Sequence, residues 1–86
     1  MKPDASPALV ASAVEEMCRL WMDDLAPQEA RLRGPSAPPA LVHLARAIDG
    51  CFATVSALRE EGPEALIVAE ACQELQRLAL AMLRRA

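Results

Sequence analysis

Aromatic side chains are scarce in this 86-residue chain, which contains Trp21, Phe52 and no tyrosine. Aromatic residues bury the largest area per side chain, so leucine, valine and alanine must fill the core, and 53% of the residues are hydrophobic. A chain of this length has room for a single domain, residues 1–86, and removes only about 60% of its unfolded surface from water. A core of small aliphatic side chains therefore predicts that self-association supplements the fold.

Clustered positive charge is also absent. The net charge is −3, lysine occurs once, and the eight arginines are spread along the chain. The close basic pairs are Arg31 with Arg33 and Arg84 with Arg85, and no aromatic residues alternate with them. We therefore expect no binding to nucleic acid, which requires a basic face that neutralises phosphates. Arginine in place of lysine, with abundant alanine and leucine, indicates a GC-rich genome and predicts a bacterial or phage origin.

The sequence has no recognisable secretory signal or long apolar run. Residues 1–6 are polar and contain proline, without the apolar centre of a signal peptide. No uninterrupted apolar run approaches the roughly 20 residues that span a bilayer. We therefore expect a soluble, cytoplasmic protein with no membrane partner.

The residue combinations that carry catalysis or bind metals are missing as well. Cys18, Cys51 and Cys72 are odd in number and widely spaced, without a CxxC motif. Each falls on or beside an apolar stripe, where a free cysteine behaves as a small hydrophobe; a disulfide or a metal site is the alternative. His43 is the single histidine, and neither a glycine-rich phosphate loop nor a G-x-S-x-G motif occurs. We predict a protein that is not an enzyme and that uses no metal or cofactor.

Apolar residues recur at alternating spacings of three and four, the pattern of amphipathic helices. Ser6 followed by Pro7 is a typical helix start. Gly62 with Pro63 is predicted to end one helix and begin the next, and so short a connection requires an antiparallel hairpin. We predict an all-α three-helix bundle with a flexible tail at 1–6 and helices at about 7–25, 39–61 and 63–85.

The predicted helix 39–61 has two faces that could pack against neighbours. One is a stripe of larger side chains: Leu41, Leu44, Ile48, Cys51, Val55 and Leu58. About 200° around the helix lies a strip of small ones: Ala40, Ala47, Gly50, Thr54 and Ala57. Because small side chains let another helix approach closely, we expect this helix to occupy the middle of the bundle.

The predicted helix 63–85 has more apolar width than one three-helix packing covers. Its inner side is predicted to hold Val68, Ala71, Cys72, Leu75, Leu78, Ala79 and Met82. Uncovered apolar surface on a small protein usually marks a binding site, and Trp21 is either a core residue or an interface anchor. The predicted partner-binding residues are Leu66, Leu80, Leu83, Ala47, Gly50, Thr54 and Trp21.

The stretch from His43 to Phe52 resembles the helix of histidine phosphotransfer domains. That family places a phospho-accepting histidine on a helix surface, a lysine or arginine three residues later and a glycine four residues later. Arg46 stands at the basic position, Ala47 stands at the glycine position, and Phe52 is the later apolar residue. The resemblance implies phosphoryl transfer through His43, steadied by Arg46, in a four-helix bundle.

The surplus apolar surface and the missing catalytic groups favour a non-enzymatic protein that binds another protein. We expect an adaptor, a chaperone or an inhibitor that forms homodimers. The alternative is a phosphorelay protein that uses His43. The two are separable, because one depends on surface leucines and the other on the histidine.

Overall fold

The computed structural model describes residues 6–85, which form helices and turns without a strand. The all-α prediction is confirmed, whereas the flexible tail predicted at 1–6 lies, except for Ser6, outside the described residues. Along the chain the elements are α1 (Pro7–Arg19), the π-helix η1 (Leu20–Leu25), the 3-10 helix η2 (Ala26–Gln28), α2 (Glu29–Arg33), α3 (Pro39–Ala57) and α4 (Gly62–Arg85).

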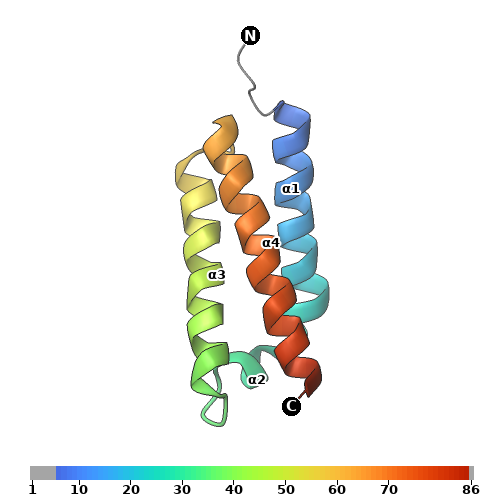
Figure 1. Cartoon of the computed structure of the whole chain (residues 1–86), viewed down its shortest axis with the longest axis vertical. Coiled ribbons are helices and arrows are strands. Elements are labelled where there is room, and N and C mark those ends of the chain that lie inside the picture. Colours follow the sequence, from blue (N-terminus) through green and yellow to red (C-terminus); the bar gives the residue numbers. More distant parts are fainter. Residues whose placement is uncertain (1–5, 86) are drawn as a thin grey trace.

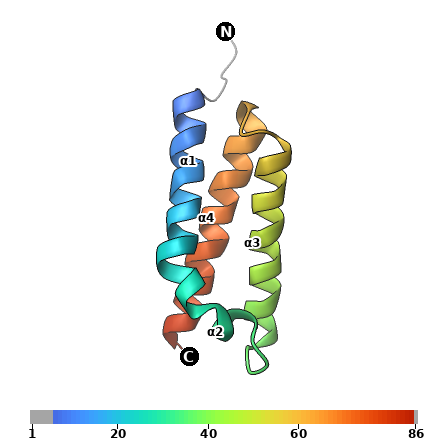
Figure 2. The ribbon, with the colours of Figure 1, turned by 180° about the vertical axis from the view of Figure 1, so that it is seen from behind.

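The long helix α4 lies between the other two long helices, with α1 on one side and α3 on the other (Figure 1). The reverse view shows α4 behind the gap between α1 and α3 (Figure 2). The prediction that helix 39–61 occupies the middle is therefore wrong. The physical reason is the row of small residues on α4, because Ala65, Ala69 and Ala79 are fully buried and let both neighbours approach.

The core forms where the three long helices converge, and α2 covers one end of it (Figure 2). Arg31 of α2 donates a hydrogen bond of 2.7 Å to the carbonyl of Leu83 near the end of α4. Arg33 of α2 donates one of 2.6 Å to the carboxylate of Asp49 on α3. The buried residues are Val10, Ala13, Met17, Leu20, Leu25, Leu32, Leu41, Ala45, Ile48, Val55, Ala65, Ala69, Cys72, Gln76, Ala79 and Leu83.

Helix α3 ends at Ala57, four residues before the predicted boundary at Glu61. Arg59 and Glu60 adopt left-handed backbone angles, with φ of 58° and 55°. The amide of Glu60 donates to the carbonyl of Val55, which is the closing bond of a Schellman-type cap. Gly62, at φ 78°, starts α4. Non-glycine residues thus make the turn that the sequence pattern assigns to glycine.

The first long helix changes its winding before it ends. From Leu20 to Leu25 it is a π-helix, and the amide of Ala26 donates to the carbonyl of Trp21, five residues earlier. Pro27, which has no amide hydrogen, follows within η2. The winding therefore changes within the helix predicted at about 7–25, and the π-helix ends at the predicted boundary, Leu25.

By length and composition alone, α3 is apolar enough to cross a membrane, and only 22% of its apolar stretch is buried in the bundle. The sequence pattern predicts no such segment, because no uninterrupted apolar run approaches the roughly 20 residues that span a bilayer. Length and composition are weak evidence here, because helices of water-soluble bundles share them. Arg46 and Asp49 lie near the middle of α3, where an arginine or aspartate in a spanning helix costs about 2.5–3.5 kcal/mol.

Candidate interaction surface

Helix α4 turns its small side chains inward and several larger ones outward. Its buried row contains mostly alanine and cysteine, whereas Ile67 is 64% exposed and Leu78 is 50% exposed. Val68, Leu75 and Met82 are half-buried beside them, where each contacts the core with part of its side chain. The outward row, which we call the α4 stripe, consists of Val68, Ala71, Leu75, Leu78 and Met82, with Ile67 beside it. Its spacings of three and four are those of a coiled-coil seam.

Helix α3 carries a matching row of smaller residues. Ala47 and Thr54 are exposed, and Leu44, Cys51 and Leu58 are half-buried. A Cβ atom placed on the neighbouring Gly50 would find no atom within 4 Å. We call this row of Leu44, Ala47, Cys51, Thr54 and Leu58 the α3 stripe. It also alternates in steps of three and four.

The two stripes lie on the same side of the molecule, away from α1 and η1. Gln73 of α4 points toward α1, because its Nε2 donates a 2.9 Å hydrogen bond to the carbonyl of Ala13. Leu75, two residues on, lies about 200° around α4 from Gln73. On α3, Asp49 points toward α2, and Cys51 lies about 200° around from it. The two stripes together form what we call the α3–α4 apolar face.

The residues predicted to bind a partner fall in three different environments. Leu83 is 3% exposed and belongs to the core, so its predicted exposure is wrong. Leu66 and Leu80 are half-buried and pack against the core, and so does Trp21. The ring of Trp21 also lies 5.7 Å from the guanidinium carbon of Arg33. The other three predicted residues are exposed on α3: Ala47, Gly50 and Thr54.

The prediction from sequence missed Ile67, which is the most exposed large hydrophobic residue of α4, and placed Leu78 inside the bundle. A prediction from periodicity assigns every leucine and isoleucine to the core, whichever stripe of the helix it lies on. Side-chain size is the signal that could have identified Ile67 and Leu78 as exposed. The alternative stripe of α4, with Ala65, Ala69 and Ala79, has the same spacing but fits a closer helix pair.

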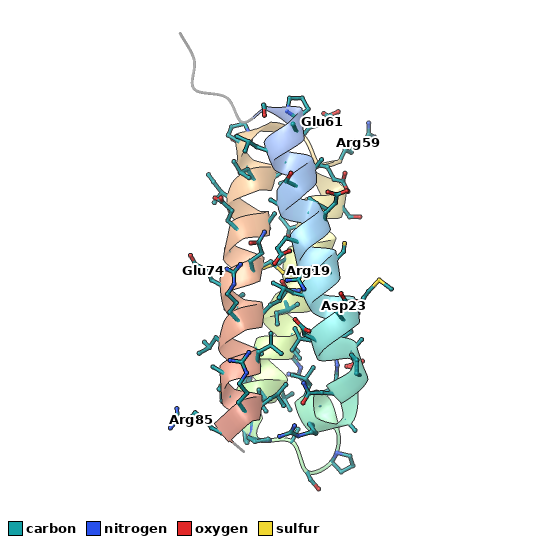
Figure 3. All side chains as sticks on the ribbon, turned by 90° about the vertical axis from the view of Figure 1, so that its right-hand side faces the viewer. Arg19, Asp23, Arg59, Glu61, Glu74 and Arg85 are labelled. Carbon is teal, nitrogen blue, oxygen red and sulfur yellow. The ribbon has the colours of Figure 1, made fainter. Side chains whose placement is uncertain are left out.

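Charged residues border the α3–α4 apolar face. Arg46 is exposed on α3 next to the small residues, and Glu74 is exposed on α4. Figure 3 shows Glu74 on the edge of α4 that points away from α1. Two of the charged pairs elsewhere are local, Arg19 with Glu16 on α1 at 2.7 Å and Arg33 with Glu29 at 2.7 Å, and Arg33 also pairs with Asp49 of α3 at 2.6 Å.

His43 is exposed on α3, and Arg46 lies three residues further along. The imidazole is therefore accessible, as the phosphotransfer resemblance requires. Around it are the small residues Ala40, Ala47 and Gly50. Within residues 6–85, no three His, Cys, Asp or Glu side chains gather in a way that could hold a metal ion.

Cys72 offers no activated nucleophile. Burial and, to a lesser extent, the nearby Cys51 raise the pKa of its thiol to about 12. Cys72 is therefore a protonated core residue at neutral pH. Cys18 is exposed in a shallow hollow along α1, lined also by Glu15, Glu16 and Asp23.

Comparison of the chain with protein-family models, with curated proteins and with solved structures finds no match. The function is therefore argued from the surface of the molecule.

Proposed function

We propose that the protein is a non-enzymatic interaction module of the adaptor, chaperone or inhibitor type. It is encoded by a bacterium or a phage and acts in the bacterial cytoplasm. It binds an amphipathic helical surface of a protein through the α3–α4 apolar face. In this proposal α3 and α4 form an antiparallel hairpin, and the module works as a homodimer.

The observation that carries the proposal is the arrangement of side chains on α4. Ala65 and Ala69 are fully buried, while Ile67 is 64% exposed. Single exposed apolar residues are ordinary on protein surfaces. Here, however, the exposed and half-buried residues of α4 repeat at seam spacing and adjoin a second apolar row on α3. A contiguous apolar surface of this kind is typical of binding sites.

The spacing of the α4 stripe also defines the partner's secondary structure. Side chains spaced three and four residues apart project along one line of a helix, and each can insert into the space between side chains of a second helix, as in knobs-into-holes packing. An extended peptide would instead need an exposed strand edge, and no strand occurs between residues 6 and 85. A helical partner is therefore favoured.

Site-specific crosslinking tests the proposal. A photoreactive phenylalanine analogue replaces Leu78, and in a second protein it replaces Leu9, which is 56% exposed on α1. We expect irradiation of living source cells to give one discrete adduct from position 78 and none from position 9. The captured protein, once purified, should bind the wild-type chain saturably and the Ile67→Glu variant weakly. The same adducts from both positions, or none from position 78, would refute the proposal.

The second candidate function is phosphoryl transfer through His43. It is supported by the exposure of His43 and by the exposed Arg46 on the same helix. It does not explain the outward leucine of the α4 stripe, because a phospho-accepting histidine needs access rather than apolar surface. We therefore rank it second and state its test among the predictions below.

A further inference from the structure

We infer that a second copy of this chain covers the α3–α4 apolar face, related by a two-fold axis parallel to the helices. Each α3 then packs on the α4 of the other copy, and the two hairpins form a four-helix bundle with α1 outside it. This inference rests on the proposed function and names the partner.

The two stripes complement each other in size. The α3 stripe has Ala47 and Thr54 exposed at its centre, whereas the α4 stripe presents the larger Leu75 and Leu78. A two-fold axis parallel to the helices places the small row of each copy against the large row of the other. An axis perpendicular to the helices would instead set small rows on small rows and large rows on large rows. The parallel axis therefore gives the closer packing.

The charges at the edges of the face agree with the same arrangement. Arg46 precedes the end of α3 at Ala57 by 11 residues, about 17 Å along the helix, and Glu74 follows the start of α4 at Gly62 by 12 residues, about 18 Å. Figure 1 shows that α3 and α4 meet at one turn. The two rises along the helices, about 17 Å and about 18 Å, therefore place the two residues at nearly the same height. The parallel two-fold axis preserves height, so it brings Arg46 of each copy to the level of Glu74 of the other. Opposite charges there favour this register.

The area of the face reaches the lower limit for a specific interface. Helix α3 has 19 residues, which gives a length of about 28 Å, and two helices side by side are about 20 Å wide. The footprint is about 560 Å² on each copy, or about 1,100 Å² for the pair. Specific interfaces start at about 1,000 Å².

Sedimentation equilibrium of the full chain, from micromolar to millimolar concentration, provides the first test. We expect a dimer that Leu78→Glu weakens at least about 30-fold, because the variant places a carboxylate in the apolar seam of both copies. Leu9→Glu is the matched control, since Leu9 has a similar exposure on α1, and it should leave the dimer unchanged. Circular dichroism checks that both variants keep the wild-type helix content.

Charge reversal provides the second test and reports the register. Arg46→Glu and Glu74→Arg should each weaken the homodimer about tenfold at low salt. An equimolar mixture of the two variants should form heterodimers, because every contact between positions 46 and 74 then joins opposite charges. The double variant, Arg46→Glu with Glu74→Arg, should recover wild-type affinity. At about 1 M salt these differences should vanish.

The outcomes distinguish this inference from the proposed function. A wild-type chain that stays monomeric at millimolar concentration overturns the inference, and a discrete adduct with a different protein from position 78 would still support the binding module. A dimer that ignores Leu78→Glu overturns the inference, because the face is then not the interface between the two copies, and the crosslinking result at position 78 decides the proposed function separately. A dimer that responds to Leu78→Glu but whose charge variants form no heterodimers overturns the two-fold arrangement.

Discussion

Replacing Gln76 with methionine should stabilise the protein. Gln76 is the one fully buried polar residue among residues 6–85. Its Nε2 donates a 2.8 Å hydrogen bond to the carbonyl of Met17, but its Oε1 has no hydrogen-bond partner in the protein. Methionine has a similar length and carries no group that needs such a partner. The exchange therefore removes one good hydrogen bond and one unsatisfied oxygen.

The size of the effect follows from these two contributions. Losing the hydrogen bond to the Met17 carbonyl costs about 1 kcal/mol. That carbonyl still accepts from the amide of Leu20, so it is not left without a donor. Removing a buried oxygen that lacks a partner returns about 1–3 kcal/mol. We expect a net gain of about 1 kcal/mol, which raises the Tm of a domain of this size by about 4–8 °C.

Gln73 provides the matched control for this measurement. Its Nε2 donates to the carbonyl of Ala13 at 2.9 Å, and its Oε1 accepts from Arg77 at 3.4 Å. Both ends of this amide have partners, so Gln73→Met should destabilise the fold by about 1 kcal/mol. Urea unfolding followed by circular dichroism, at one fixed protein concentration, measures both variants. Equal destabilisation by Gln76→Met and Gln73→Met would refute the reasoning.

Three further predictions concern the backbone, the surface charge and the histidine. Gly50→Ala should stabilise the protein by about 1 kcal/mol in thermal unfolding, because the interior of a helix disfavours glycine and a Cβ at this position meets nothing within 4 Å. Gly62→Ala should instead lower the stability by about 1 kcal/mol, because Gly62 has a φ of 78°. A hydrogen bond from Arg19 holds the pKa of Glu16 below its usual value. At a pH above the unfolded-state pKa of glutamate, this pair therefore stabilises the fold. The stabilisation is lost as the pH falls through the lowered pKa of the folded state. Urea unfolding of Glu16→Gln should therefore show lower stability than wild type near neutral pH and the same stability in acid. Incubation with acetyl phosphate should give no acid-labile phosphoryl adduct, and an adduct lost in His43→Ala would establish the phosphotransfer function instead.

The sequence predicts the helical class well, because the chain repeats apolar residues at helical spacing with few interruptions. Leu41, Ile48 and Val55 belong to the predicted stripe of the second long helix, and all three are buried. Ser6 accepts a hydrogen bond of 3.2 Å from the amide of Leu9, as a capping serine does. These features depend on residues close together in the chain, which is why sequence patterns contain them.

The features that the sequence does not predict depend on contacts between distant residues. The end of α3 at Ala57 requires left-handed angles at Arg59 and Glu60, which are uncommon for residues other than glycine. The π-helix η1 begins three residues after Met17, whose carbonyl accepts the hydrogen bond from Gln76, 59 residues away along the chain. Residue propensities give no indication of either feature.

The orientation of α4 shows the same limit most clearly, and it also supports the proposed dimer. Two stripes of equal spacing run along this helix, so periodicity cannot decide which one faces the bundle. Side-chain size decides, because the stripe with Ala65 and Ala69 permits α1 and α3 to approach closely. A monomer buries the inner stripe and parts of Val68, Leu75 and Met82 in the outer one, but it leaves Ile67 and Leu78 at least half exposed. A dimer uses both, and it adds apolar burial to a small core that contains few large side chains. The Tm should therefore rise with protein concentration, and Leu78→Glu should abolish that rise while Leu9→Glu preserves it.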